Sequence, residues 1–330
     1  MAPTPLFGRV LVSCLRPVSW LYALVGVLSH RFSKPEKVGV PVICVGNVVV
    51  GGAGKTPFVL WLANHLKNNG HSPHILLRGY GGSHSKSNHR VTLTDTVELV
   101  GDEALLYVDK FPTWVGGDRV KSAQLAQDAG ADIILMDDGF QNHGLTKDLS
   151  FLIVDRQVGF GNGLVLPAGP LREPLNAAFK RTQHIVVMGN EKLPLPQNLP
   201  VSVKVYEARV ELRDEDVAWL KNKNLIAFSG IGRPEKFFDS LKNVGANLLA
   251  VRSFPDHHVF TEQELQDLQN LKIELEAQYG QVTLVTTSKD HLRLSKVHQQ
   301  GVKLVRVDLR PKDEFKILNV IDQLVKSTIA

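Results

Sequence analysis

Residues 41–66, PVICVGNVVVGGAGKTPFVLWLANHL, place a short apolar run, a glycine-rich loop and a helical pattern of apolar residues in that order. This order of strand, loop and helix is typical of a phosphate-binding loop, in which backbone N–H groups and the positive end of a helix bind an anion. Lys55 is predicted to reach the β- and γ-phosphates of a nucleotide, and Thr56 to hold Mg²⁺. The residues expected to bind the nucleotide in this loop are Gly51, Gly52, Ala53, Gly54, Lys55 and Thr56.

Val49 stands where the common pattern of such loops has its first glycine. This difference removes one permissive glycine but none of the chemical groups that bind phosphate. The alternative interpretation is a glycine-rich turn that only happens to precede Lys55 and Thr56. The apolar run before the loop and the helical pattern after it favour the phosphate-binding interpretation.

Residues 132–138, DIILMDD, predict an apolar strand that ends in two carboxylates, Asp137 and Asp138. In nucleotide-binding proteins of this kind, an acid at such a strand end completes the Mg²⁺ shell that the loop threonine begins. The alternative is an ordinary polar strand end, and the phosphate-binding loop upstream makes it the weaker interpretation. Gln141 lies just beyond the two acids and is a further candidate for the nucleotide site.

Three arginines lie in or next to glycine-rich turns. Arg78 opens the turn RGYGG after an expected strand, Arg119 follows Gly-Gly-Asp before an expected helix, and Arg172 lies near the end of a long glycine-rich segment, residues 159–174. A loop of that length within a compact domain is usually functional. Arg172 is therefore the candidate for phosphate contact.

Asp102 and Glu103 precede a short apolar stretch, residues 104–108, that predicts a helix. Acids in the first turn of a helix stabilise its dipole. The residues alone therefore favour a structural role for this pair over a catalytic one.

The composition is that of a folded globular protein with a mild excess of positive charge. The chain has 330 residues, 43% of them hydrophobic, a net charge of +5 and an isoelectric point near 9.1. Such a charge suits anionic lipid, but the basic residues are dispersed, so no binding of nucleic acid is inferred. Two cysteines, Cys14 and Cys44, make neither a disulfide framework nor a metal site, which favours a cytoplasmic location.

The most apolar stretch of the chain is residues 4–31. Its uncharged part, residues 17–29, is shorter than the roughly 20 residues that cross a hydrocarbon core. Trp20 and Tyr22 are aromatic residues of the kind found at membrane interfaces. We therefore expect a helix that lies in the membrane surface; packing of this helix on the soluble core is the alternative.

The second half of the chain predicts a smaller α/β unit. The sequence Gly230-Ile231-Gly232 is a weak dinucleotide signal and is better explained as a tight turn between strand and helix. Residues 201–212 and 302–309 are expected to pair as a two-stranded connector, and residues 312–328 to form a final amphipathic helix.

The expected fold class is α/β: a P-loop kinase-like, mostly parallel sheet flanked by helices, a second, smaller α/β domain and an N-terminal membrane-surface helix. The proline-rich piece at 193–200 is expected to be a boundary. The expected division is an N-terminal helix at 1–35, a P-loop kinase domain at 36–198, a two-stranded linker at 199–212 and 302–310, a smaller domain at 213–301 and a C-terminal helix at 311–330.

Several motifs in order make the sequence similar to one family over nearly its whole length. The motifs are VGNVVVGGAGKTP at 45–57, RGYGG at 78–82, GDE at 101–103, DDGFQ at 137–141, GFGNGLVLPAGPLREP at 159–174, FPDHH at 254–258 and TTSKD at 286–290. The chain resembles the tetraacyldisaccharide 4'-kinases, which phosphorylate a membrane-embedded disaccharide in the lipid A pathway. The valine at position 49 is itself similar to what this family has.

The resemblance implies roles for individual residues. It places Lys55 and Thr56 on nucleotide and metal, and Gln141 and Arg172 near the phosphates. The other implied roles are Asp137 and Asp138 at the metal, Glu103 assisting the metal, Asp102 as the base and His257 as its partner. Asp102 and His257 belong to different expected domains, so we hypothesise a cleft whose closure brings them together.

The resemblance also implies ATP and Mg²⁺ as cofactors and a membrane-embedded acylated disaccharide phosphate as acceptor. The protein is then expected on the cytoplasmic face of the bacterial inner membrane, as a peripheral (monotopic) protein on an anionic surface. The sequence identifies no protein partner, and it leaves open which of Arg78, Arg119 and Arg172 contacts the donor phosphate and which the acceptor phosphate.

The rival interpretation is a membrane-associated P-loop ATPase switch of the partitioning type, which hydrolyses ATP and needs no lipid acceptor. Such proteins carry an extra lysine near the start of the loop, whereas residues 47–50 here are uncharged. A soluble small-molecule kinase is a third possibility, and it leaves the apolar N-terminus unexplained.

Overall fold

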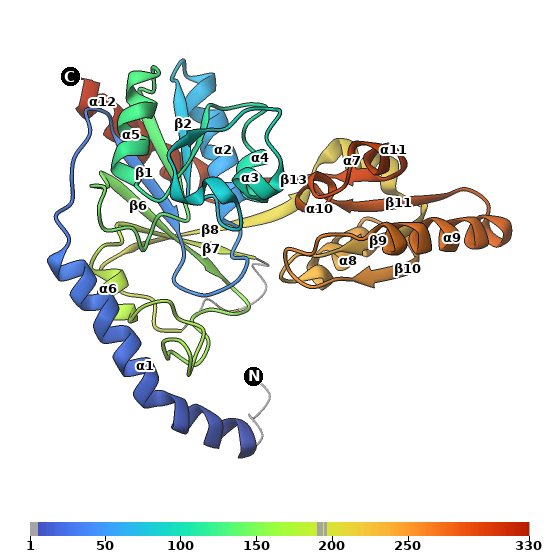
Figure 1. The fold of residues 1–330 in the computed structure, drawn as a ribbon, viewed down its shortest axis with the longest axis horizontal. Helices are drawn as coiled ribbons and strands as arrows, with labels where there is room; N and C mark the ends of the chain where they lie inside the picture. The colour runs from blue at the N-terminus through green and yellow to red at the C-terminus, as the bar shows by residue number, and fades with distance from the viewer. Residues whose placement is uncertain (1–5, 190–193, 195–196, 330) are drawn as a thin grey trace.

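The computed structural model describes residues 6–189, 194 and 197–329, so that residues 4 and 5 of the apolar N-terminal stretch and 193, 195 and 196 of the expected boundary lie outside the described residues. Figure 1 shows a larger unit, a smaller unit beside it and a long N-terminal helix, α1 (Leu6–Phe32), that extends away from both. The predicted α/β class with a mostly parallel sheet is confirmed.

The larger unit is built on a nine-stranded sheet in the order β13-β8-β7-β6-β1-β5-β2-β4-β3. Only the two edge pairs, β13 with β8 and β3 with β4, are antiparallel. Parallel neighbours align their carboxyl ends along one edge of the sheet, which is where open α/β folds bind ligands. The strands are β1 (Val42–Gly46), β2 (Pro73–Leu77), β3 (His89–Arg90), β4 (Thr113–Val115), β5 (Ile133–Asp137), β6 (Leu149–Asp155), β7 (His184–Met188), β8 (Lys204–Leu212) and β13 (Val307–Pro311).

Helices cover both faces of this sheet, because its central strands are mostly apolar and buried on both sides. One face packs against Phe58 and Leu62 of α2 and Ile317 of α12. The other face packs against Ala123 of α5 and Ala178 of α6. The helices of the larger unit are α2 (Lys55–Asn68), α3 (Val97–Val100), α4 (Asp102–Leu105), α5 (Arg119–Asp128), α6 (Leu175–Phe179) and α12 (Glu314–Ile329), with a 3₁₀ turn at Ser83–Lys86.

The smaller unit has a four-stranded parallel sheet in the order β10-β9-β11-β12. Phe237 and Leu241 of α8 pack on one face, and Leu265 and Leu268 of α9 on the other. Its elements are α7 (Asp214–Leu220), β9 (Asn224–Ser229), α8 (Pro234–Asn243), β10 (Asn247–Ser253), α9 (Glu262–Tyr279), β11 (Val282–Thr287), α10 (Ser288–Leu292), α11 (Lys296–Gly301) and β12 (Lys303–Val305).

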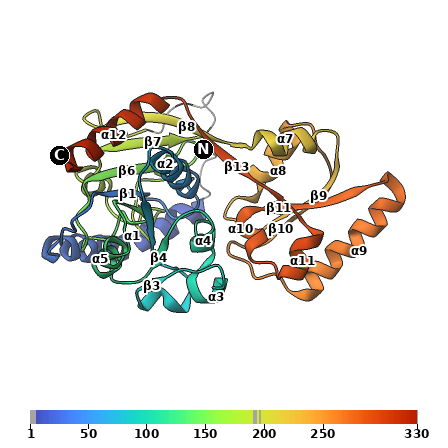
Figure 2. The ribbon, with the colours of Figure 1, turned by 90° about the horizontal axis from the view of Figure 1, so that it is seen from above.

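Two strands, β8 and β13, connect the units, which lie side by side in Figure 2. The prediction of one strand over 302–309 is wrong in its first half, because β12 pairs with β11 in the smaller sheet. The chain changes sheets at Arg306, whose backbone N–H donates to Asp216 Oδ2 at 2.8 Å instead of to a strand. Residues 307–311 then pair with β8, as predicted for the connector, and this pairing is antiparallel.

Shorter elements also differ from the sequence-based expectations. The polar segment 83–98, for which the sequence predicts no regular element, contains the edge strand β3 and the one-turn helix α3. The helix expected over 104–108 is instead α4 (Asp102–Leu105). The chain turns after it and buries Tyr107 completely within the larger unit.

Helix α1 touches the larger unit mainly through a few small or polar side chains. Ser19 is buried and its Oγ accepts a hydrogen bond from the backbone N of Ala168 at 2.9 Å. The segment Val12–Phe32 is long and apolar enough to cross a membrane by length and composition alone, and little of it is buried. Several large apolar side chains of α1 are exposed: Val18, Trp20, Leu21, Tyr22, Leu24, Val25, Val27 and Leu28.

Candidate active site

The phosphate-binding loop joins β1 to α2 at the carboxyl edge of the larger sheet. Gly54 precedes the helix in the left-handed conformation (φ 91°), and Gly51 has φ 108°. These dihedrals are accessible to glycine and strained for other residues, so the loop depends on its glycines at these two positions. Ala53 and Thr56 of the loop are buried, and Gly52 is exposed.

Residues 48–50 of the loop are hydrogen-bonded to the long glycine-rich segment. Arg172 N donates to Val48 O at 2.7 Å, and Val50 N donates to Pro170 O at 2.9 Å. Val49 forms a β-bridge with Leu171. A β-branched residue suits a β-bridge position, which explains why valine serves where the common loop pattern has glycine.

Lys55 and Arg172 both contact Asp138. Lys55 Nζ lies 3.4 Å from Asp138 Oδ1 and donates to Asn47 Oδ1 at 3.3 Å. Arg172 Nη1 donates to Asp138 Oδ1 at 3.0 Å and Oδ2 at 2.9 Å. Burial opposes ionisation of Asp138, but the two cations outweigh it and hold its pKa below the ordinary value. Arg172, expected on phosphate, therefore binds a carboxylate at the edge of the nucleotide loop.

Asp137 is buried in a carboxylate-rich environment. Its Oδ2 accepts hydrogen bonds from Tyr107 Oη at 2.6 Å and Thr56 Oγ1 at 3.4 Å. Burial first, and the nearby charges of Glu103 and Asp138, raise the pKa of Asp137 to about 7, despite the opposing effect of Lys55. The Oδ1 atom of Asp137 is buried and has no hydrogen-bond partner among the described residues.

These residues fit a Mg²⁺ ion. Mg²⁺ usually takes one or two carboxylates together with substrate phosphates and water, and a free buried carboxylate oxygen next to a threonine hydroxyl offers such ligands. Glu103 is close enough to influence the charge of Asp137. Within the described part of the chain no group of three or more His, Cys, Asp or Glu residues is arranged to hold a metal by itself, so phosphate oxygens are needed to complete the shell.

Gln141 braces the start of the loop. Its Nε2 donates to Asn47 O at 2.9 Å and to Glu173 Oε1 at 3.0 Å, and its Oε1 accepts from Arg172 Nη1 at 3.4 Å. The side chain thus joins the acid-rich strand end, the glycine-rich segment and the loop.

Asp102 of the larger unit and His257 of the smaller unit meet across the boundary. His257 Nδ1 lies 3.1 Å from Asp102 Oδ2, and Arg293 Nη2 donates to the same oxygen. Arg293 is anchored in turn by Asp290 Oδ1 at 2.9 Å and by Gly230 O at 2.8 Å. Burial opposes ionisation of Asp102, but His257, Lys289 and Arg293 outweigh it and lower its pKa. The hydrogen bond with Asp102 raises the pKa of His257.

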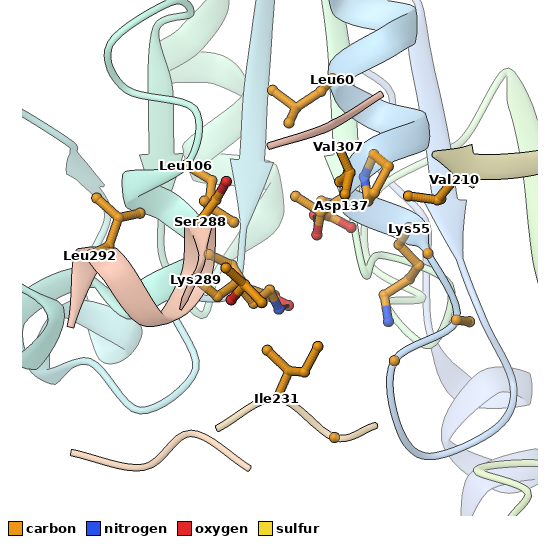
Figure 3. Close-up of a pocket in the computed structure, with 18 of the residues that line it drawn as sticks. Lys55, Leu60, Leu106, Asp137, Val210, Ile231, Ser288, Lys289, Leu292 and Val307 are labelled. Carbon is orange, nitrogen blue, oxygen red and sulfur yellow. Dashed lines mark hydrogen bonds and ion pairs between the residues drawn. The ribbon is translucent and has the colours of Figure 1, made fainter. Parts of the chain in front are cut away.

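A second cross-boundary pair lies beside the first. Lys289 Nζ of α10 donates to Glu103 Oε1 at 2.7 Å. In Figure 3, Lys289 and Lys55 lie on opposite sides of one hollow, and Ile231 of the smaller unit faces them. The expected metal-assisting residue Glu103 is thus paired with a lysine of the other unit.

Arg78 and Arg119 line the same hollow and differ in burial. Arg78 is exposed, whereas Arg119 at the start of α5 is 5% exposed. Burial first, and then the charge of Arg78, lower the pKa of Arg119 to about 10. Within the described residues, Arg119 Nε and Nη1 have no hydrogen-bond partner. A buried cation with free donors is costly unless an anion joins it.

The hollow has a volume of about 3420 Å³ and receives residues from both units. The phosphate loop, Asp137, Asp138, Glu103 and His257 all line it. Tyr22 of α1 lines it as well, so the hollow extends toward the N-terminal helix.

The sequence-predicted site residues are therefore gathered at this boundary, while several of their partners were not predicted. Tyr107, which donates to Asp137, lies in what the sequence indicated as a helix end. Arg293 and Lys289 lie in or just after the motif TTSKD, to which the sequence pattern alone assigned no role. Their positive charge close to a strand end was the available signal.

Comparisons with known proteins agree with one another. The family model described as tetraacyldisaccharide-1-P 4'-kinase matches residues 11–326. A tetraacyldisaccharide 4'-kinase of Gluconobacter oxydans is 42% identical over 311 residues, which cover 93% of each chain. The enzyme of that name from Paramagnetospirillum magneticum is 42% identical over 298 residues, covering 89% of each chain.

A solved structure is similar over nearly the whole fold. It is described as the "apo" form of LpxK from Aquifex aeolicus in complex with ATP. The two structures superpose with a TM-score of 0.76 at 30% sequence identity, covering 96% of this chain and 99% of the other.

Proposed function

The chain belongs to the tetraacyldisaccharide 4'-kinase family, and we propose that its catalytic residues lie in and beside the hollow between the two units. It is an ATP-dependent kinase that phosphorylates the 4'-hydroxyl of tetraacyldisaccharide 1-phosphate in lipid A biosynthesis, giving the 1,4'-bisphosphorylated lipid and ADP. The partitioning-type ATPase is not favoured.

ATP binds, in this proposal, with its β- and γ-phosphates over the N–H groups of residues 51–56. Lys55 and Arg172 leave Asp138 in part and donate to phosphate oxygens, which carry more negative charge than one carboxylate. Gln141 keeps the loop and the glycine-rich segment in register. Three contacts support this placement: Lys55 on Asp138, Arg172 on Asp138 and Gln141 on Asn47.

The residues that would hold Mg²⁺ are Thr56, Asp137, Asp138 and Glu103. The ion, when bound, neutralises charge on the β- and γ-phosphates. The free Oδ1 of Asp137 supports its assignment as a direct ligand. Asp138 and Glu103, each paired with a basic side chain, suit contacts through water.

The proton of the 4'-hydroxyl passes to the pair Asp102–His257 as the hydroxyl oxygen bonds to the γ-phosphorus. The bond between the γ-phosphorus and the oxygen that bridges it to the β-phosphate breaks, and ADP leaves. A sugar hydroxyl is a weak nucleophile, so a positioned base lowers the barrier. Asp102 is the base in this assignment, and His257 orients it and takes up charge.

Arg119 is proposed to donate to an anionic group of the reactants, because its free Nε and Nη1 atoms line the hollow. Its charge interacts with that of Asp138, which lies at the γ-phosphate end of the loop. This proximity favours the transferring phosphoryl group as its partner. Arg78, which is exposed and lines the same hollow, is proposed to bind the 1-phosphate that the acceptor already carries.

The N-terminal apolar helix and the lipid pathway indicate membrane association. We further propose that α1 is peripheral on the anionic cytoplasmic face of the inner membrane, where the acylated acceptor lies. The exposed apolar side chains Trp20, Leu21 and Leu24 support insertion into a bilayer surface. The hollow extends from Tyr22 to His257, so an acceptor rising along α1 has a route to the Asp102–His257 pair.

The observation that carries the catalytic assignment is the contact between Asp102 and His257 above the phosphate loop. The test is transfer of label from γ-labelled ATP to the disaccharide acceptor in detergent micelles. Wild type should place label in the lipid fraction, and Asp102→Ala should place none there while still binding ATP. Asp267→Ala, which removes an exposed aspartate of α9, is the matched control. If wild type released label only as free phosphate, or if Asp102→Ala transferred label to lipid normally, the catalytic assignment would be wrong.

A further inference from the structure

The turn between β9 and α8 of the smaller unit reaches the phosphate loop of the larger unit. Arg233 Nη2 donates to the backbone carbonyl of Gly52 at 3.3 Å. Gly232 lies next to this contact: a Cβ added there would be 3.9 Å from Gly52 N and 3.1 Å from Asp256 Oδ2. The turn therefore approaches the loop closely at Gly232 and Arg233.

Asp155 fixes the arginine in this position. It is the last residue of β6, and its side chain is 8% exposed. Arg233 Nη1 donates to Asp155 Oδ1 at 3.2 Å, and Arg233 Nη2 donates to Oδ2. A guanidinium bound to a carboxylate through two N–H groups has a defined plane and direction. The Gly52 contact is therefore directed and not that of a freely moving side chain.

Asp155 also has a second cation, which makes an internal comparison possible. Lys236 Nζ donates to Asp155 Oδ2 at 2.6 Å. Lys236 and Arg233 both bind the carboxylate of Asp155, but of the two only Arg233 also donates to Gly52 O. Loss of either side chain removes an ion pair between the units, but only loss of Arg233 removes the contact with the loop.

The contact with Gly52 O determines how the next N–H group points. In a trans peptide the C=O and the N–H of one unit point in opposite directions. A Gly52 carbonyl that is held by Arg233 thus directs the N–H of Ala53 away from Arg233. Asn47 Nδ2 acts similarly one residue earlier, because it donates to Gly51 O at 3.3 Å.

We propose that Arg233, docked on Asp155, is a positioning residue that orients the Gly52–Ala53 peptide for phosphate binding. The smaller unit thereby completes the cradle for the donor phosphates, in addition to contributing His257. This inference rests on the proposed function of residues 51–56 as the ATP site. It assigns a role to Arg233 and Asp155, which lie outside that loop.

The test is direct binding of ATP to the full-length protein without acceptor, by calorimetry or with a fluorescent ATP analogue. Arg233→Gln should raise the Kd for ATP about tenfold, the order expected for loss of a hydrogen bond from a charged group. Lys236→Gln should change it less than about twofold, as should Arg252→Gln, since Arg252 Nη1 donates to Val251 O of its own strand, β10. In steady-state kinetics, Arg233→Gln should raise KM for ATP and leave KM for the acceptor unchanged.

A double-mutant cycle tests the role of Asp155. Asp155→Asn keeps an oxygen for the turn at Gln157 but weakens the hold on Arg233. It should weaken ATP binding in the wild-type background and have no further effect in Arg233→Gln.

Three results would overturn the inference: an unchanged Kd in Arg233→Gln, an equal effect of Lys236→Gln, or a parallel rise of KM for both substrates. The proposed function fails separately, if Lys55→Ala binds ATP normally. Loss of binding in Lys55→Ala with normal binding in Arg233→Gln would leave the function intact and remove only this inference.

Discussion

His257 Nδ1 lies 3.1 Å from Asp102 Oδ2, although the two residues are 155 positions apart and belong to different units. Neither unit alone contains both members of the pair. In the proposed mechanism, in which this pair accepts the proton of the acceptor hydroxyl, chemistry requires the two units to be in contact.

The His257–Asp102 contact should make stability depend on pH. The hydrogen bond with Asp102 raises the pKa of His257 above its ordinary value of 6.5, and burial opposes it only in part. A raised histidine pKa stabilises the fold fully below pH 6.5 and loses this effect as pH rises through the folded-state value. The loss in free energy of unfolding caused by His257→Gln should be largest near pH 6 and shrink toward pH 9, in urea titrations at a series of pH values.

His298→Gln is the control for that series, because His298 pairs with the exposed Glu262 on the outside of the smaller unit. A His257→Gln effect that is constant from pH 6 to pH 9 would show that the pair contributes no charge interaction.

Asp137→Asn should stabilise the protein free of metal and nucleotide at alkaline pH. Burial raises the pKa of Asp137 to about 7 from 3.8, so the native state retains a proton that the unfolded chain has lost. Wild-type stability therefore falls as pH rises between these values, and the variant lacks that fall. In EDTA, the difference in free energy of unfolding between variant and wild type should grow from pH 4 to pH 7 and then level off.

Adding Mg²⁺ and ATP at pH 8 should reverse the order, because only wild type has the carboxylate for the metal. A difference that does not vary with pH, or equal stabilisation of both proteins by Mg²⁺ and ATP, would contradict the assignment of Asp137.

Arg119→Met should separate stability from activity. The wild-type side chain is a buried cation whose Nε and Nη1 atoms have no partner among the described residues. An apolar chain of similar length removes that cost, so the free energy of unfolding should rise by about 1 kcal/mol. The kcat should fall by about tenfold or more, because the negative charge of the transition state loses a hydrogen-bond donor. A variant that is both destabilised and fully active would exclude this role.

The exposed face of α1 should control membrane binding. Trp20 is 69% exposed and Leu24 53% exposed, and each contributes about 1.5–3 kcal/mol when buried in an apolar phase. Trp20→Glu with Leu24→Glu should lower binding to anionic vesicles by at least tenfold in sedimentation assays. Turnover of acceptor dispersed in detergent should be retained. Phe315→Glu, on α12 and 83% exposed, is the control and should bind vesicles normally.

The features that could be predicted from the sequence depend on neighbouring residues. The run from β1 to α2 carries its own periodicity, its glycines and its lysine, so the positions of the loop and the helix follow from local pattern alone. The acids at the end of β5 were recognisable for the same reason.

The residues that were missed act over long separations. Arg293 meets Asp102 over 191 positions, and Tyr107 reaches Asp137 only because α4 ends early. The division of 302–309 depended on Asp216, which binds the backbone of Arg306 from another element. No local pattern reports such pairings, because tertiary contacts decide them.

The glycine-rich segment 159–174 also joins two functional parts of the molecule. Within it, Ala168 is bonded to Ser19 of α1, and a few residues later Pro170 and Arg172 are bonded to Val50 and Val48 of the loop. Helix α1 and the phosphate-binding loop are thus joined by a short hydrogen-bonded segment, residues 168–172. With α1 in a bilayer, as proposed, this segment fixes the height of the γ-phosphate above the lipid plane. The sugar headgroup of the acceptor must then rise to that height.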